Sequence, residues 1–341
     1  MTAMEAIAVA SAFVAGVLLP FALIPILRRL GVLDVPNDRS SHTVTAVRGV
    51  GLTITLAVLI GFAIIWWGGP RTDGPLLPVV AAIAVAAATL GWIEDYRGVS
   101  VGWRFGLQLA IGALGTTAMV VITDSSWWWV LVGALALTAY INVANFMDGI
   151  NGISGLHGMT VGVFFAGTAL LDDQPWLVAP SLVVAAAFAS FLPWNLGRGH
   201  VFLGDVGSYL LGATLAALGA AAFLNGMEPG YLLGPVVIYL ADTGYTLLVR
   251  IRTGERWYAA HRQHVYQRLT DVGLGHLASA LTVTVATALC AGGATLSVLA
   301  PSPGQYLWGV FIVAVIVAYL SSPVWIGRLT GARRGVGTRD K

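Results

Sequence analysis

The sequence predicts an all-α protein that crosses a membrane about eleven times, and its composition, hydropathy and charge placement each favour this fold. Of its 341 residues, 57% are hydrophobic and 10% are charged, whereas a soluble domain carries about 25% charged residues. Apolar stretches of roughly 18 residues or more, long enough to cross about 30 Å of hydrocarbon, recur along the whole chain. We therefore expect residues 1–341 to form one integral membrane domain.

The apolar stretches can be placed in order along the chain. The first contains Glu5, has no basic segment before it and leads into Arg28 and Arg29 without a small-residue cleavage site. We therefore interpret it as a retained helix and not as a signal peptide. The expected helices cover residues 4–27, 50–67, 76–93, 103–123, 127–144, 153–171, 177–194, 207–225, 230–249, 277–299 and 305–326.

The basic residues lie almost entirely on one side of this predicted topology. Seventeen of the 18 fall in the loops after odd-numbered helices or in the C-terminal tail, and Arg71 is the exception. Because cytoplasmic loops carry an excess of lysine and arginine, that side is the cytoplasm. The N-terminus is then outside, the C-terminus inside, and residues 328–341 form a basic cytoplasmic tail.

The polar clusters of the chain share this side with the arginines. An active site that faces a soluble, anionic substrate requires such segregation, whereas structural polar residues do not. The predicted active-site loops are residues 28–49, 94–102, 145–152, 195–208 and 250–275.

Two of these loops present carboxylates close to where a helix ends. Glu94 and Asp95 suit a divalent cation or a base that acts on a phosphate, although a solvated helix end explains them equally well. Asp148 is followed by Gly149 and Gly152, so its backbone can approach a ligand closely. An ordinary Asx/Gly turn is the alternative.

A third loop carries Asp205, which is expected just before the eighth helix, between Gly204 and Gly207. Helix N-termini favour phosphate, and an aspartate in this position also serves as a plain N-cap. The most basic loop holds His261-Arg-Gln-His264, which suits a pyrophosphate or a lipid headgroup. Asp242, inside the ninth helix, is expected to have a supporting role.

Carboxylates on several inner segments, together with a cationic loop, predict a site for phosphates and a hard divalent cation. Oxygen ligands favour Mg²⁺, or Mn²⁺, over zinc. The single cysteine, Cys290, lies in an apolar stretch and provides no zinc cluster.

The motifs together resemble those of the polyprenyl-phosphate N-acetylhexosamine-1-phosphate transferases, of the glycosyltransferase family 4 type, over nearly the whole chain. The form of the basic loop is similar to that of the subgroup that starts O-antigen and related surface glycans. The matching segments are Arg39-Ser-Ser-His42, Arg48-Gly-Val-Gly51, Glu94-Asp95, Asn145-Phe-Met-Asp148-Gly-Ile-Asn-Gly152, Val201-Phe-Leu-Gly-Asp205-Val-Gly-Ser208, Asp242-Thr243 and His261-Arg-Gln-His264-Val-Tyr-Gln267.

This resemblance implies a Mg²⁺-dependent enzyme in a bacterial plasma membrane, with eleven helices and the active site facing the cytoplasm. The reaction it implies transfers a sugar-1-phosphate from a UDP-sugar to undecaprenyl or another polyprenyl phosphate, releases UMP and begins surface-glycan synthesis. The partners are then both substrates and the membrane, with no nucleic acid; a homodimer is compatible with the family.

The resemblance also implies roles for individual residues. Asp205 would be the principal metal ligand, and Asp95 with Glu94 would face the metal and the lipid phosphate, one of them acting as a base. Asp148 and Asn145 would hold the nucleotide-sugar. The remaining substrate contacts would come from His42, Arg48, Asn151, Asn195, Gly204, His261, Arg262 and His264.

The sequence departs from the family pattern in three places. Glu94 replaces the first aspartate of the usual acidic pair, and Asn151 replaces the second aspartate of an Asp-Gly-x-Asp-Gly pattern. The proline pair and middle glycine of the first loop are replaced by Thr45, Val47 and Val50, so the shape of that loop is the feature that the resemblance predicts least well.

Two questions of mechanism and class remain open at this level. The lipid phosphate could attack the donor directly, or an aspartate could first form a covalent phosphosugar. A polytopic transporter or lipid-linked glycan flippase is the main rival, although transporter sites lie near the membrane midplane and these polar groups gather on one face. An enzyme joining CDP-alcohols would need Asp-Gly-x-x-Ala-Arg, which the segment after Asp148 lacks.

Overall fold

The computed structural model describes residues 1–35, 45–68, 75–197, 200–255 and 262–330. Within these ranges, 11 helical segments are long and apolar enough to cross a membrane, which confirms the predicted fold class. Ten of them are single helices: α1 (Ala3–Arg29), α2 (Gly51–Gly68), α3 (Leu76–Arg97), α4 (Val101–Thr123), α5 (Trp128–Met147), α6 (Ile153–Leu171), α7 (Pro175–Leu196), α8 (Gly204–Leu224), α12 (His276–Leu299) and α13 (Gly304–Leu329).

The ninth segment is broken into three pieces. It consists of α9 (Pro229–Leu233), a 3₁₀ turn, η2 (Gly234–Val236), and α10 (Val237–Arg252). Pro235 lies in the turn, and because proline has no N–H and clashes with the preceding turn, a continuous α-helix cannot pass through it unchanged. The sequence predicted the span but not this interruption.

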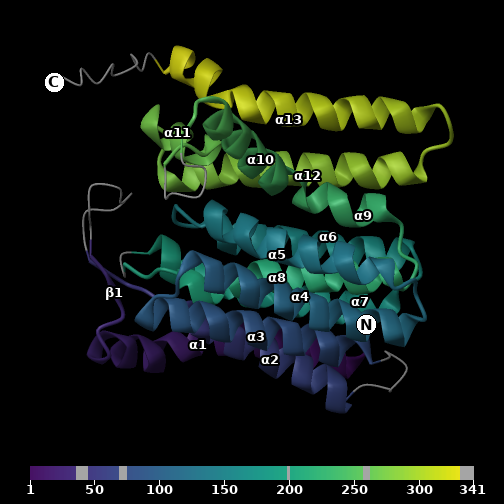
Figure 1. The fold of residues 1–341 in the computed structure, drawn as a ribbon, viewed down its shortest axis with the longest axis horizontal. Helices are drawn as coiled ribbons and strands as arrows, with labels where there is room; N and C mark the ends of the chain where they lie inside the picture. The colour runs from purple at the N-terminus through teal and green to yellow at the C-terminus, as the bar shows by residue number, and fades with distance from the viewer. Residues whose placement is uncertain (36–44, 69–74, 198–199, 256–261, 331–341) are drawn as a thin grey trace.

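Three further elements lie at one end of the helix bundle, where Figure 1 shows β1 and α11 on the left. The two-residue strands β1 (Leu33–Asp34) and β2 (Ala46–Val47) pair antiparallel, and Val47 also forms a parallel bridge with Val201. The helix α11 (Val265–Asp271) follows α10. These segments are too short for hydrophobic periodicity to predict them.

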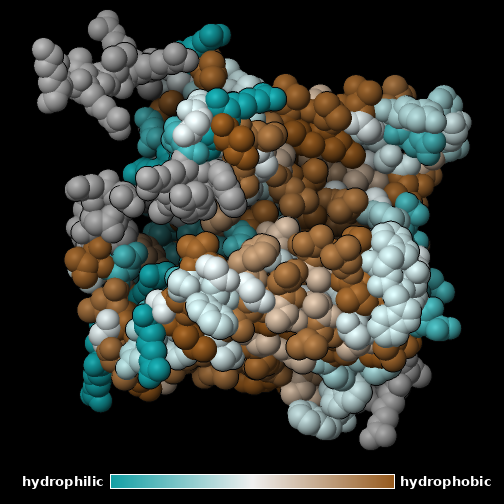
Figure 2. Space-filling model, viewed as in Figure 1, coloured by the Kyte–Doolittle hydropathy of each residue, from teal (hydrophilic) through white to brown (hydrophobic). Residues whose placement is uncertain are grey.

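The helices run side by side, and α1 begins at the opposite end of the bundle from where α13 ends (Figure 1). An odd number of spans requires this arrangement. Figure 2 shows hydrophobic residues over the middle of the visible face and hydrophilic residues toward its two ends, as expected for a lipid-facing surface.

Glycines bring α3 and α5 close to α8, which is the most buried span, with 78% of its most apolar window inside the protein. A Cβ on Gly212 of α8 would lie 2.7 Å from the Cα of Ile141 in α5, and one on Gly91 of α3 would clash with the backbone of Asp205. Small residues allow such close contact between membrane helices. The ends of α3, α5 and α8 therefore meet at one place.

Candidate active site

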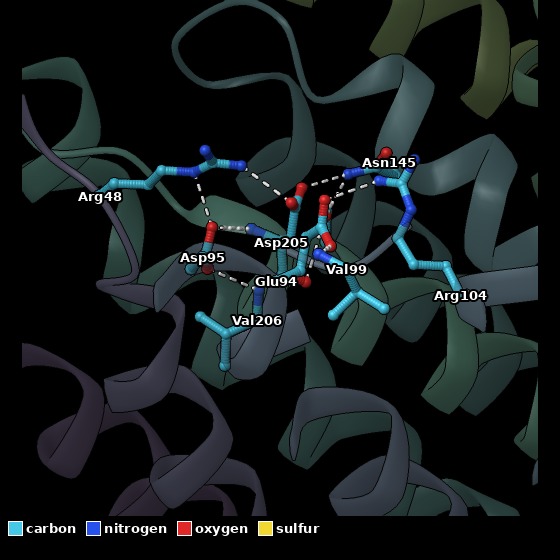
Figure 3. Close-up of polar contacts among 9 residues, drawn as sticks. Arg48, Glu94, Asp95, Val99, Arg104, Asn145, Asp205 and Val206 are labelled. Carbon is cyan, nitrogen blue, oxygen red and sulfur yellow. Dashed lines mark hydrogen bonds and ion pairs between the residues drawn. The ribbon is translucent and has the colours of Figure 1, made fainter. Parts of the chain in front are cut away.

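Asp95 and Asp205 meet where α3 ends and α8 begins (Figure 3). Asp95 Oδ1 accepts a hydrogen bond from the Asp205 amide at 2.9 Å, and Asp95 Oδ2 accepts one from the Val206 amide at 2.9 Å. The helix α8 begins at Gly204 rather than at the expected residue 207, so Asp205 lies in its first turn. Asp95 therefore satisfies two N–H groups that the start of a helix leaves without partners, and its negative charge favours that end of the helix dipole.

Arg48 joins the two carboxylates from a third segment (Figure 3). Its Nε lies 2.6 Å from Asp95 Oδ1, and its Nη2 lies 2.8 Å from Asp205 Oδ2. Burial alone would lower the pKa of Arg48, but the negative charges of Asp205 and Asp95 outweigh it and raise the pKa. The guanidinium is therefore held in its charged form between both carboxylates.

The backbone beside Arg48 is fixed by an extended segment that the sequence did not predict. The Val47 amide donates to the His200 carbonyl at 2.8 Å, and the Phe202 amide donates to the Val47 carbonyl at 2.9 Å. On the other side, the Arg48 amide donates to the Val32 carbonyl at 3.1 Å. The first loop thus reaches the segment before α8 in spite of its departures from the family pattern.

Asn145 contacts Asp205 from the last turn of α5. Its Nδ2 donates to Asp205 Oδ1 at 2.7 Å and to Ser208 Oγ at 3.1 Å. Ser208 was not predicted as a site residue, although it closes the Gly204-Asp205-Val-Gly-Ser208 motif. The structure therefore brings four of the predicted residues into direct contact: Arg48, Asp95, Asn145 and Asp205.

Glu94 uses its carboxylate differently from its neighbour. Its Oε2 accepts a hydrogen bond from the Val99 amide at 2.6 Å, and its Oε1 pairs with Arg104 Nη1 at 2.9 Å. Arg104 was counted among the cytoplasmic charges but not expected in the site. The acidic pair is thus divided between two sets of partners, and a metal contact for Glu94 stays a prediction.

Asp148 follows the last residue of α5, and its Oδ1 accepts a hydrogen bond from Ser154 Oγ at 2.6 Å. Its removal from water raises the pKa of its carboxyl to about 7, and the negative charges of Asp205 and Asp95 act in the same direction. Ser154 is a site residue that the sequence analysis missed.

The loop after Asp148 is held to the loop before α8 through Asn195. The Gly152 amide donates to Asn195 Oδ1 at 2.5 Å, and Asn195 Nδ2 donates to the Val201 carbonyl at 2.8 Å. The Asn151 amide donates to His276 Nδ1 at 3.4 Å. The amides of Asn151 and Gly152 thus have protein partners, and substrate contacts of Asn151 and Asn195 stay predictions.

Gly204 occupies a position that only glycine fits. Its φ is +74°, and a Cβ there would lie 2.6 Å from Asp95 Oδ2 and 2.7 Å from the Gly49 amide nitrogen. Glycine tolerates positive φ and allows close backbone approach. It therefore lets the first loop, α3 and α8 come together.

The basic loop continues into α11, which Asp242 of α10 anchors. Asp242 Oδ1 lies 3.0 Å from His264 Nδ1 and accepts a hydrogen bond from the Val265 amide at 3.1 Å. Asp242 Oδ2 accepts from the Tyr266 amide at 3.3 Å and from the Tyr319 hydroxyl at 2.6 Å. Asp242 therefore holds the start of α11, which agrees with the supporting role expected for it.

The histidines and arginine of that loop are not equally placed. His264 is buried against Asp242, whereas the Arg262 side chain is 35% exposed and pairs weakly with Asp271 at 3.3 Å. His42 and His261 lie outside the described residues. Phosphate binding by His261, Arg262 and His264, and a substrate contact of His42, stay predictions.

The carboxylates of Asp95 and Asp205 are hard oxygen donors, which suit Mg²⁺ or Mn²⁺. The guanidinium of Arg48 already lies between them as a cation. Within the described part of the chain, no group of three or more histidine, cysteine, aspartate or glutamate residues could hold a metal ion. The two carboxylates suit a divalent cation by their chemistry, and a metal ion at this site stays a prediction.

These features define an integral membrane protein with an acidic, arginine-bridged site at one end of its helix bundle. Residues 77–222, which contain Asp95, Asp148 and Asp205, match the glycosyl transferase family 4 model. This match agrees with the family predicted from the motifs.

The curated relatives are transferases of similar length. The decaprenyl-phosphate N-acetylglucosaminephosphotransferase of Mycobacterium leprae is 27% identical over 79% of this chain and 78% of its own. The undecaprenyl-phosphate alpha-N-acetylglucosaminyl 1-phosphate transferase of Escherichia coli K12 is 26% identical over 77% of this chain and 76% of its own. A Bacillus subtilis protein described as a probable undecaprenyl-phosphate N-acetylglucosaminyl 1-phosphate transferase is 25% identical over 80% of each chain.

Proposed function

We propose that this protein transfers a sugar-1-phosphate from a UDP-sugar to a polyprenyl phosphate, releases UMP and acts at the cytoplasmic face of a bacterial membrane. The donor we favour is a UDP-N-acetylhexosamine, because the relatives are named for N-acetylglucosamine, and the product would begin a surface glycan. The observation that supports this proposal most strongly is the convergence of Asp95, Asp205 and Arg48 from three segments.

In the proposed reaction, an oxygen of the lipid phosphate forms a bond to the β-phosphorus of the donor. The bond between that phosphorus and the bridging oxygen breaks, and its electron pair leaves with UMP. Protein residues position the two substrates and balance their charge. A divalent cation, held by Asp205 and Asp95, would supply charge neutralisation on the pyrophosphate.

An apolar cavity inside the bundle supports a lipid acceptor, and its lining extends from Tyr140, in the middle of α5, to Trp129, at the end of α5 away from the site. It has a volume of about 430 Å³ and lies between α4, α5, α6, α8, α9, η2 and α10. One lining residue, Tyr140, lies five residues before Asn145 on α5, which corresponds to about 8 Å along the helix. A prenyl chain in this cavity could keep its phosphate near Asp205. The cavity is also lined by Phe165, Leu215, Gly219, Phe223 and Leu232.

The test is to incubate purified protein, Mg²⁺ and undecaprenyl phosphate with a panel of UDP-sugars and to measure UMP. Asp205→Asn should abolish UMP release at every Mg²⁺ concentration while the variant keeps the elution profile of the folded protein. Asp124→Asn is the matched control, because Asp124 is exposed at the far end of α4 in a left-handed conformation that asparagine tolerates. Turnover of Asp205→Asn at the original rate, or substrate movement across vesicles without UMP, would contradict the proposal.

A further inference from the structure

All four carboxylate oxygens of Asp95 and Asp205 have partners. Asp95 Oδ1 and Oδ2 accept hydrogen bonds from the two backbone amides at the start of α8, and Asp205 Oδ1 accepts one from Asn145. Arg48 Nε contacts Asp95 Oδ1, and Arg48 Nη2 contacts Asp205 Oδ2. A divalent cation that binds both carboxylates would therefore meet a cationic group that already binds both.

The guanidinium is the partner that can leave most easily. The amides of Asp205 and Val206 belong to α8, and Asn145 belongs to α5, so moving them would disturb the helices. The Arg48 side chain is 37% exposed, whereas the Asp95 side chain is fully buried. Since the neighbouring backbone is fixed by hydrogen bonds, the long arginine side chain can change rotamer without moving the loop.

We infer that the Arg48 guanidinium and a divalent cation compete for the Asp95 and Asp205 carboxylates. Arg48 keeps these like charges from facing each other without a cation, which would be costly at a partly buried site. When a cation replaces it, the freed guanidinium becomes available to a phosphate of the donor, for which its fork of donors is suited. This inference rests on the divalent-cation part of the proposed function.

The competition can be measured without turnover, by titrating Mn²⁺ into detergent-purified protein and following the free ion by electron paramagnetic resonance. Arg48→Gln should bind Mn²⁺ about tenfold more tightly than the original protein, because it removes a positive charge next to the ligands. Arg97→Gln removes the same charge from an exposed position near the end of α3 and should change the affinity less than about twofold. Asp205→Asn should weaken the binding in both backgrounds, which assigns the ion to this site.

Equal or weaker Mn²⁺ binding by Arg48→Gln would overturn the inference. Should that variant not fold, Arg48→Lys provides the second test: its ammonium cannot contact both carboxylates in the same way, so Mn²⁺ affinity should rise less than in a neutral variant but still exceed the original. An unchanged affinity of Arg48→Lys would also count against competition. If no form binds Mn²⁺, competition is refuted, and UMP release in the presence of EDTA then shows whether the proposed transfer itself still holds.

Discussion

The carboxylate of Asp95 accepts a hydrogen bond from the backbone amide of Asp205, so one acidic residue holds the backbone of another. This contact, at 2.9 Å, lies next to a second one from Val206. These contacts explain how two negative charges can lie close together. The carboxylate of Asp95 is surrounded by backbone N–H donors and by Arg48, which offset its charge.

The first prediction separates the roles of these two aspartates. Asp95→Asn replaces one acceptor oxygen by a donor that faces a backbone N–H or Arg48, so it should destabilise the fold by about 1–3 kcal/mol as well as abolish activity. Asp205→Asn should abolish activity with a smaller effect on stability, because Asp205 accepts only side-chain hydrogen bonds. Thermal unfolding in detergent measures the difference, and equal melting temperatures of the two variants would contradict it.

The second prediction concerns Gly204. Gly204→Ala combines positive φ with a Cβ 2.6 Å from Asp95 Oδ2, so both melting temperature and UMP release should fall, the latter by at least about tenfold. Gly226→Ala, between α8 and α9, is the control: its φ is +94°, but nothing lies within 4 Å of its added Cβ. It should cost about 1 kcal/mol of stability and leave activity unchanged. Equal effects of the two substitutions would show that contact with Asp95 is unimportant.

Most of the fold could be predicted because the membrane imposes a simple length rule. The bounds expected for α6, residues 153–171, are those observed, and other span ends differ by a few residues. The interruption around Pro235 was missed because the span stays apolar through the turn, so hydropathy does not change there.

Four residues that the sequence predicted for the site meet in the structure, but the contacts that join them were not predicted. Sequence order and loop parity placed Asp95, Asp148 and Asp205 on one side, as the structure has them. The contacts of the acidic residues were harder to predict, because Ser154 reaches the carboxylate of Asp148, and Arg104 that of Glu94, through helix packing and loop geometry. The periodicity of hydrophobic residues in the sequence does not predict such contacts.

The third prediction is a pH dependence that comes from Asp148, whose pKa is raised to about 7. The fold therefore favours its protonated form, and its contribution to stability is full below about pH 4 and is lost as the pH rises through about 7. Asp148→Asn is neutral throughout, so it should lose less stability than the original protein between pH 5 and pH 8. Melting temperatures at both pH values measure this, and parallel curves would contradict it.

The ionisation of Asp148 should also affect the rate of UMP release. If the ionised carboxylate takes part in the transfer, UMP release rises as the pH increases through about 7 and then levels off. In Asp148→Asn, this limb of the pH profile should be absent and the remaining rate low. Persistence of the limb in the variant would assign it to another group.

The fourth prediction tests the apolar cavity. Gly219→Leu adds a side chain to its wall, where the nearest atom to an added Cβ is in Phe165 at 3.8 Å. The KM for polyprenyl phosphate should rise about tenfold while the KM for the UDP-sugar stays unchanged. Gly167→Leu, on an exposed face of α6 with nothing near its added Cβ, should change neither value. A shift in the UDP-sugar KM alone would place the cavity outside the acceptor's path.

The last prediction concerns the anchor of α11. Tyr319 of α13 donates a 2.6 Å hydrogen bond to Asp242, and Tyr266 of α11 donates one to the Phe146 carbonyl at 3.0 Å, two residues before Asp148. Through these contacts α13, α10 and α11 support the end of α5. Tyr319→Phe removes the shorter of the two hydrogen bonds that the buried Asp242 Oδ2 accepts, which should cost about 1–3 kcal/mol.

Hydrogen–deuterium exchange locates the effect. In Tyr319→Phe, amides of residues 265–271 should exchange faster, because Asp242 is the acceptor for the first of them. Tyr306→Phe, which removes the same hydroxyl from an exposed position on α13, should leave the exchange of that segment unchanged. If both variants behave alike, the start of α11 does not depend on the Tyr319–Asp242 hydrogen bond, and the other contacts of Asp242 are sufficient to hold it.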